Sequence, residues 1–124
     1  MGEQLRPVQV VDDDDLVNHA AGTAYYPSAG ISLSGTSVFT VGITAADCTV
    51  SVEQTIDGVT WIDVTDYLED IGPGLGGVGG PVTFVGSTSY QWQSWFIFGD
   101  RLRVKVVYPN DTNAVSIMVG RRSL

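Results

Sequence analysis

Apolar and polar residues alternate along much of the chain, which is typical of β-strands with one buried face. The alternation is clearest over residues 47–65, where every second residue from Cys48 to Val52 is apolar. The dipeptide Asp57-Gly58 follows, and both residues tolerate the positive φ that a type I′ turn requires. The pattern predicts a β-hairpin with a two-residue turn and with Trp61 on its buried face.

The same alternation predicts strands elsewhere, at residues 31–43, 81–86, 88–98, 101–108 and 114–120. Gly35-Thr36 interrupts the first of these, and residues 44–47 are predicted to turn into the hairpin. Residues 1–11 are predicted to form an edge strand or an extended arm, because Pro7 cannot donate to a central ladder. About eight strands with frequent turn signals and no convincing helix predict an all-β fold. We expect an antiparallel β-sandwich, jelly-roll-like or Ig-like.

The length of 124 residues predicts one domain. We divide the chain into an N-terminal arm with an acidic loop (residues 1–15) and a single β-sandwich domain (residues 16–124). Residues 66–80 contain the sequence GPGLGGVGG and form a Gly-rich loop. A connection of about 15 residues is long for a compact domain, so we expect this loop to order against a partner.

Composition narrows the possible partners. The chain has a net charge of −8, and only 16% of its residues are charged. An acidic protein repels nucleic-acid phosphates and anionic membranes, so we expect neither as a partner. A surface of uncharged polar residues suits lasting contact with other protein chains. No signal-peptide pattern and no apolar run of about 20 residues is visible.

Candidate chemistry is sparse, and we expect no catalytic activity, no metal and no cofactor. Cys48 is in phase with core residues, and the single His19 lies in another segment. The acidic run 12–15 lacks calcium-loop spacing and is predicted to be an exposed loop, with a calcium site as the alternative. The Gly-rich loop lacks the GKS or GKT ending of a phosphate-binding loop. Asp63, Asp66, Glu69 and Asp70 could supply a glycosidase carboxylate pair, but no cleft is evident.

Interaction candidates are easier to name. Arg101, Arg103 and Lys105 share one face of a predicted strand, forming a basic stripe that is either a docking edge for an acidic neighbour or a solvated face. The aromatic segment 88–98 has apolar residues on both faces near its end, so Trp95 is covered or faces a partner. From the Gly-rich loop the interaction candidates are Gly74, Leu75 and Val78.

The stretch TVSVEQTIDGVTWIDVT resembles a pattern of small virion proteins of tailed bacteriophages. The matching residues are Val50, Val52, Thr55, Asp57, Gly58, Trp61, Asp63 and Val64. The resemblance covers about 20 of the 124 residues. It implies a capsid decoration or cement protein that stabilises the phage head. The implied location is the capsid surface of the virion.

The partners implied by this resemblance are the major capsid protein and further copies of the chain, as a trimer or another cyclic homo-oligomer. Two alternatives stay open: a phage neck or tail structural protein, and a carbohydrate-binding β-sandwich module. The second would use Tyr90, Trp92 and Trp95 as a sugar platform.

Overall fold

The computed structural model describes residues 3–11, 21–70, 76–77, 80–109 and 115–123. These residues form nine strands and one short 3-10 helix, and no α-helix occurs among them. The strands are β1 (Glu3–Val11), β2 (Gly22–Ser32), β3 (Val38–Thr55), β4 (Trp61–Asp63), β5 (Glu69–Asp70), β6 (Gly76–Gly77), β7 (Val82–Ser94), β8 (Arg101–Tyr108) and β9 (Val115–Ser123), and the helix is η2 (Thr65–Tyr67). The predicted all-β class and antiparallel sandwich are confirmed.

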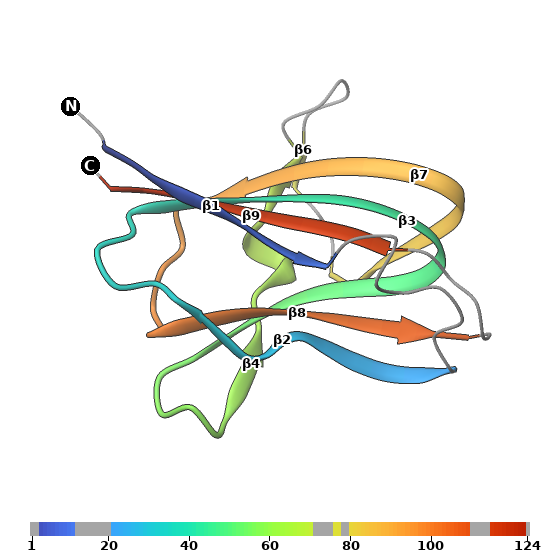
Figure 1. The fold of residues 1–124 in the computed structure, drawn as a ribbon, viewed down its shortest axis with the longest axis horizontal. Coiled ribbons are helices and arrows are strands. Elements are labelled where there is room, and N and C mark those ends of the chain that lie inside the picture. The colour runs from blue at the N-terminus through green and yellow to red at the C-terminus, as the bar shows by residue number, and fades with distance from the viewer. Residues whose placement is uncertain (1–2, 12–20, 71–75, 78–79, 110–114, 124) are drawn as a thin grey trace.

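The strands lie in two layers that share β3 (Figure 1). One layer has the order β1-β9-β3-β7-β5-β6, and the other contains β2, β8, β4 and the second half of β3. Residues 38–45 of β3 pair with β9, and residues 49–55 pair with β8. In Figure 1, β3 and β7 bend together from one layer into the other. The sandwich is therefore one continuous sheet folded over on itself.

The bend in β3 corrects the prediction of a turn at residues 44–47. The strand continues without interruption for 18 residues. Asp47 has a φ of 48°, and the pairing with β7 shifts register between Ala46 and Cys48. Asp tolerates the left-handed region better than most residues, so the chain changes direction through a bulge instead of a turn.

The core lies between the two layers and follows the predicted alternation. In β8, Leu102, Val104, Val106 and Tyr108 are buried. In β9 the buried residues are Val115, Ile117 and Val119, again as predicted. Larger side chains from β3 and β7 fill the centre, namely Phe39, Ile43, Phe84 and Trp92. Cys48 is also a core residue, as expected.

The predicted hairpin exists, but its turn differs from the prediction. Thr55 pairs with Trp61, so the loop has five residues, 56–60. Only Gly58 of these has a positive φ, of 80°, whereas a type I′ turn needs two such residues. The Asp57 carboxylate instead accepts hydrogen bonds from the backbone N–H groups of Val59 (2.8 Å) and Thr60 (2.7 Å). These bonds close a longer loop around the side chain.

Other strand boundaries also differ from the prediction. The two strands expected at 81–86 and 88–98 are the single strand β7, which ends at Ser94. The last strand, predicted to end at residue 120, continues through Arg121 and Arg122, which both pair with β3. Of the two alternatives for the N-terminal segment, the edge strand is confirmed: β1 is the first strand of its layer and pairs with β9 from Glu3↔Ser123 onwards. No described helix is long and apolar enough to cross a membrane.

Candidate interaction surface

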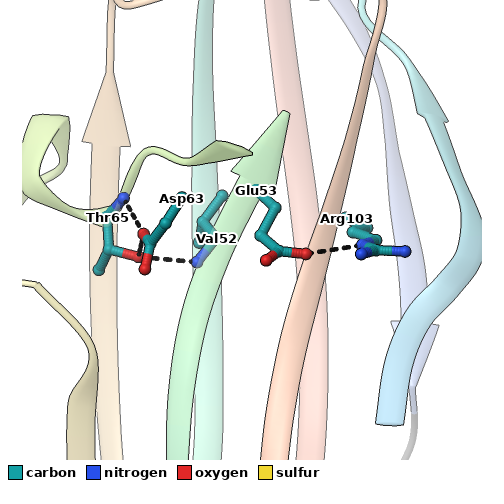
Figure 2. Close-up of polar contacts among 5 residues, drawn as sticks. All are labelled: Val52, Glu53, Asp63, Thr65 and Arg103. Carbon is teal, nitrogen blue, oxygen red and sulfur yellow. Dashed lines mark hydrogen bonds and ion pairs between the residues drawn. The ribbon is translucent and has the colours of Figure 1, made fainter. Parts of the chain in front are cut away.

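The hairpin motif is held together by bonds within the protein. The Asp63 carboxylate accepts hydrogen bonds from the backbone N–H of Thr65 (2.8 Å) and from its hydroxyl (2.5 Å). The same hydroxyl oxygen accepts a hydrogen bond from the Val52 N–H at 2.9 Å (Figure 2). Thr65 thus continues the pairing between β3 and β4 with a side-chain atom. Asp63 is a structural residue that locks the end of the hairpin.

Trp61 lies on the outer face of the sandwich, contrary to the prediction. A two-residue turn would have paired Trp61 with Gln54, which shares the inward register of Val52, but the five-residue loop pairs it with Thr55, which lies in the opposite register. A shift of one residue moves every side chain of a strand to the other face. The half-buried Trp61 ring covers the Arg103 guanidinium carbon at 4.0 Å from the ring centre. The turn length therefore decided which face Trp61 occupies.

The basic stripe on β8 lies on the same outer face. Arg103 forms an ion pair with Glu53 at 2.7 Å (Figure 2). The Tyr25 ring also covers its guanidinium carbon, at 3.9 Å. Arg101 donates hydrogen bonds to the carbonyl oxygens of Ala29 (3.3 Å) and Gly30 (2.9 Å). Two of the three cations are thus engaged within the chain, and Lys105 is half-buried beside them.

The connection from β7 to β8 presents aromatic side chains to solvent. Trp95 is 56% exposed, and Phe96 is also exposed. Phe96 stacks on Tyr67 of η2, with ring centroids 4.1 Å apart and planes 11° apart. We call Tyr67, Trp95 and Phe96 the aromatic corner. Exposed rings fixed against each other are typical of interface anchors, because little side-chain freedom is left to lose on binding.

Gln54 fixes the backbone of this connection. Its side chain is fully buried. The amide nitrogen donates to the carbonyl oxygen of Phe96 at 2.7 Å. The amide oxygen accepts from the N–H groups of Phe98 and Gly99, both at 3.1 Å. One polar side chain in the buried register of β3 therefore satisfies three backbone groups of the aromatic loop.

Further contacts make the loop rigid. The Ser94 hydroxyl donates to the Tyr67 carbonyl oxygen at 2.8 Å and accepts from the Phe96 N–H at 3.1 Å. A Cβ on Gly99 would lie 2.6 Å from the carbonyl oxygen of Thr55, so only glycine allows this close approach. The Asp100 N–H donates to that same oxygen at 2.7 Å. The loop is thus bonded to both η2 and β3.

A second exposed apolar group lies on the adjacent hairpin. Ile56, Val59 and Ile62 are all exposed, Val59 at 82%. We call these three residues the hairpin tip. A shallow open depression there is lined by Ile56, Asp57, Thr60 and Ile62. Ile62 pairs with Gln54, whose side chain bonds to the aromatic loop, so the hairpin and that loop are attached at the same end of β3.

The expected sugar platform does not form. Trp92 is 1% exposed and packs in the core against Phe84. Tyr90 is half-buried and stacks on Trp92 with centroids 6.0 Å apart. Trp95 stands apart from both, because β7 ends at Ser94 and the strand alternation stops there. The three rings therefore share no exposed surface.

Reactive groups are few in the described part of the chain. No three His, Cys, Asp or Glu side chains converge there in a way that could hold a metal ion. Burial raises the pKa of the Cys48 thiol to about 11, with a smaller contribution from Asp47. The predicted candidates Gly74, Leu75 and Val78 lie outside the described residues, as do His19 and the acidic run 12–15.

Sequence reasoning named Trp95 but missed Phe96, Tyr67 and Gln54. One signal was visible: Gln54 is a polar residue in an otherwise apolar register. A buried polar side chain needs partners, and here the partners are the backbone of the aromatic loop. The stacking of Tyr67 on Phe96 joins residues that are distant in the sequence and depends on the tertiary fold.

The whole fold is similar to that of YomS, an SPBc2 prophage-derived protein, with a TM-score of 0.61 and 11% sequence identity. The match covers 99% of this chain and 96% of YomS. The PBSX exported protein XepA matches with a TM-score of 0.49 and 12% identity, over 99% of this chain and 37% of XepA. A protein of Bacillus endospore appendages, which are disulfide-linked pili, matches with a TM-score of 0.45 and 13% identity, over 100% of this chain and 88% of its own. No known protein family and no curated protein matches the sequence. At these identities the likeness to YomS establishes a common fold.

Proposed function

We propose that this chain is a structural protein of a tailed-phage virion, and that it acts as a decoration or cement protein on the head. The main support is the end-to-end similarity in fold to YomS, whose description as prophage-derived agrees with the resemblance carried by the hairpin motif. The motif alone covers a small part of the sequence, whereas the fold match covers nearly all of both chains.

The geometry fits a role in attachment. The motif residues Asp57, Asp63 and Thr65 stabilise the hairpin, and Arg103 is paired within the chain. The described surface carries exposed apolar side chains on well-bonded loops, and these are available for contact with another molecule. A stiff sandwich with such a surface suits a protein that adheres to a shell.

The proposed partners are the major capsid protein and further copies of this chain. Symmetric positions on a capsid favour a cyclic homo-oligomer, and a trimer is the simplest form that matches a threefold position. Sedimentation equilibrium of the purified protein measures the number of copies in the oligomer directly. The proposed location is the capsid surface of the virion.

The decisive experiment compares phage particles made with and without this protein. We expect the protein to co-purify with wild-type particles in a fixed ratio to the major capsid protein. We also expect particles lacking it to release DNA at a lower temperature, with the loss restored by adding the purified protein. Immunogold labelling of the particles decides the position. Labelling confined to the neck or tail would contradict head decoration but keep a virion role, and absence from particles would contradict both.

A further inference from the structure

The aromatic corner and the hairpin tip are two exposed apolar groups attached at the same end of β3, and together we call them the apolar rim. Both parts are anchored at neighbouring residues of β3. Gln54 bonds to the loop that carries Phe96, and the Thr55 carbonyl oxygen accepts from the Asp100 N–H at the end of that loop. Thr55 is also the residue from which the hairpin tip begins. Both parts of the rim are therefore attached to the same end of the sandwich.

Acidic side chains accompany the rim on every segment that forms it. Exposed carboxylates lie on the hairpin, on η2 and β5, and at the end of the aromatic loop, namely Asp57, Asp63, Asp66, Glu69 and Asp100. Of the cations on β8, Arg103 is paired with Glu53, whereas Arg101 is exposed beside Asp100 and offsets one of these five carboxylates. The surroundings of the apolar rim thus carry a clear excess of negative charge.

We propose that the apolar rim docks into an apolar pocket bordered by Lys and Arg side chains on the capsid protein. This inference rests on the proposed function and adds which surface makes the contact and which chemistry receives it. Trp95 is the main anchor of this surface, because it is a large ring that is 56% exposed on a loop held by hydrogen bonds, so it can bury much area on binding. The carboxylates select and orient a basic partner, since complementary charge accelerates association and rejects like-charged surfaces.

A second copy of this chain is a poor occupant of the same surface. Two rims meeting face to face would bring their carboxylates together, in a protein whose net charge is already −8. Like charges across an interface oppose association. Any homo-oligomer therefore uses other surfaces, and the rim stays available for the capsid protein.

The test measures binding of purified protein to particles that lack it. Trp95→Ala and Phe96→Ala together are expected to weaken binding at least about 30-fold, the loss typical of a central interface anchor. Met118→Ala is the matched control, because Met118 is exposed (45%) on the outer face of the other layer, and we expect it to bind as wild type. Asp66→Asn with Glu69→Gln is expected to weaken binding at low salt and to flatten its salt dependence.

Each result decides a different point. Wild-type binding with equal binding by the Trp95→Ala, Phe96→Ala variant would overturn the rim as the contact and leave the proposed function standing. Failure of the wild type to bind would overturn the proposed function and the partner with it. Self-association that depends on Trp95 in sedimentation would show a second copy as the occupant. Should the double variant misfold, oxidative footprinting of the wild type replaces it: Trp95 must be protected on the particle and reactive in free protein.

Discussion

Replacing Gln54 with Met tests whether one buried side chain holds the aromatic loop. Met has nearly the same length and fits the same space, but it neither donates nor accepts the three hydrogen bonds. At about 1 kcal/mol for each bond, the loss is about 3 kcal/mol, and more where a backbone group is left without a partner. Against a typical stability of about 5–15 kcal/mol, this change is large.

Urea unfolding followed by circular dichroism measures this loss as a lower midpoint with an unchanged slope. The matched control is Gln91→Met, because Gln91 is an exposed glutamine on β7, and we expect a change below about 0.5 kcal/mol. A loss of less than about 1 kcal/mol for Gln54→Met would refute the idea that these bonds fix the loop.

Gln54→Glu separates the donor from the acceptor role. The introduced carboxylate can still accept from Phe98 and Gly99 but cannot donate to the Phe96 carbonyl oxygen. Burial without a cation raises the pKa of such a carboxyl, and its protonated form regains a donor. The variant should therefore be closest to wild type below the ordinary pKa of about 4.3 and lose stability as the pH rises. A stability difference that is constant between pH 4 and pH 8 would contradict this.

Three further predictions follow from the described contacts. The N–H groups of Thr60 and Val59 lower the pKa of Asp57 from its ordinary 3.8 to about 2. The stability that this carboxylate adds is therefore present above pH 3.8 and is lost as the pH falls through about 2. The melting temperatures of wild type and Asp57→Ala should accordingly differ at pH 6 and converge towards pH 2; an unchanged gap would contradict the cause. The Cys48 thiol, with its pKa of about 11, should react with a disulfide reagent at pH 8 at least about 100-fold more slowly in the native protein than in urea, and equal rates would place it outside the core. A double-mutant cycle with Glu53→Gln and Arg103→Met should give a coupling free energy of about 1–3 kcal/mol in urea unfolding. The reason is that only 12% of the Glu53 side chain and 14% of the Arg103 side chain are exposed. A coupling near zero would mean that solvent screens the pair.

Strands with one buried face were predictable from the sequence. The inward residues of β8 and β9 were correct because a period of two is imposed directly by the backbone. The fold class followed from the number of such strands. These features depend on local pattern, so a single sequence was enough to find them.

The face on which Trp61 lies was not predictable, because it depends on a single residue of register. The dipeptide Asp57-Gly58 suggested a two-residue turn, but hydrogen bonds to the Asp57 carboxylate close a five-residue loop. The change of direction was predicted at residues 44–47, but as a turn and not as a bulge within one strand. The bulge leaves the strand uninterrupted and moves its buried positions from odd-numbered residues (Phe39 to Ala45) to even-numbered residues (Cys48 to Val52).

Only part of the candidate interaction surface was predictable from the sequence. Trp95 was named, since a strand that is apolar on both faces needs a cover or a partner. The hydrogen bonds that hold the loop around Trp95 were not predictable, because those of Ser94 and Gln54 join segments that are distant in the sequence. For the basic stripe, the strand pattern was predictable but the contacts of its side chains were not. Its alternation was read correctly, yet the ion pair of Arg103 with Glu53 could not be foreseen from β8 alone.

The shared strand β3 also shapes how the protein is made. Synthesis produces residues 38–55 before any of β4, β7, β8 and β9, which are the strands that pair with both of its edges. A nascent chain therefore carries an 18-residue strand with one apolar face and open hydrogen-bonding edges until the C-terminal third emerges. Unpaired edges of this kind promote aggregation. Fragments truncated before β7 should accordingly collect in inclusion bodies. During slow translation the exposed β3 should bind chaperones until its partner strands have been made.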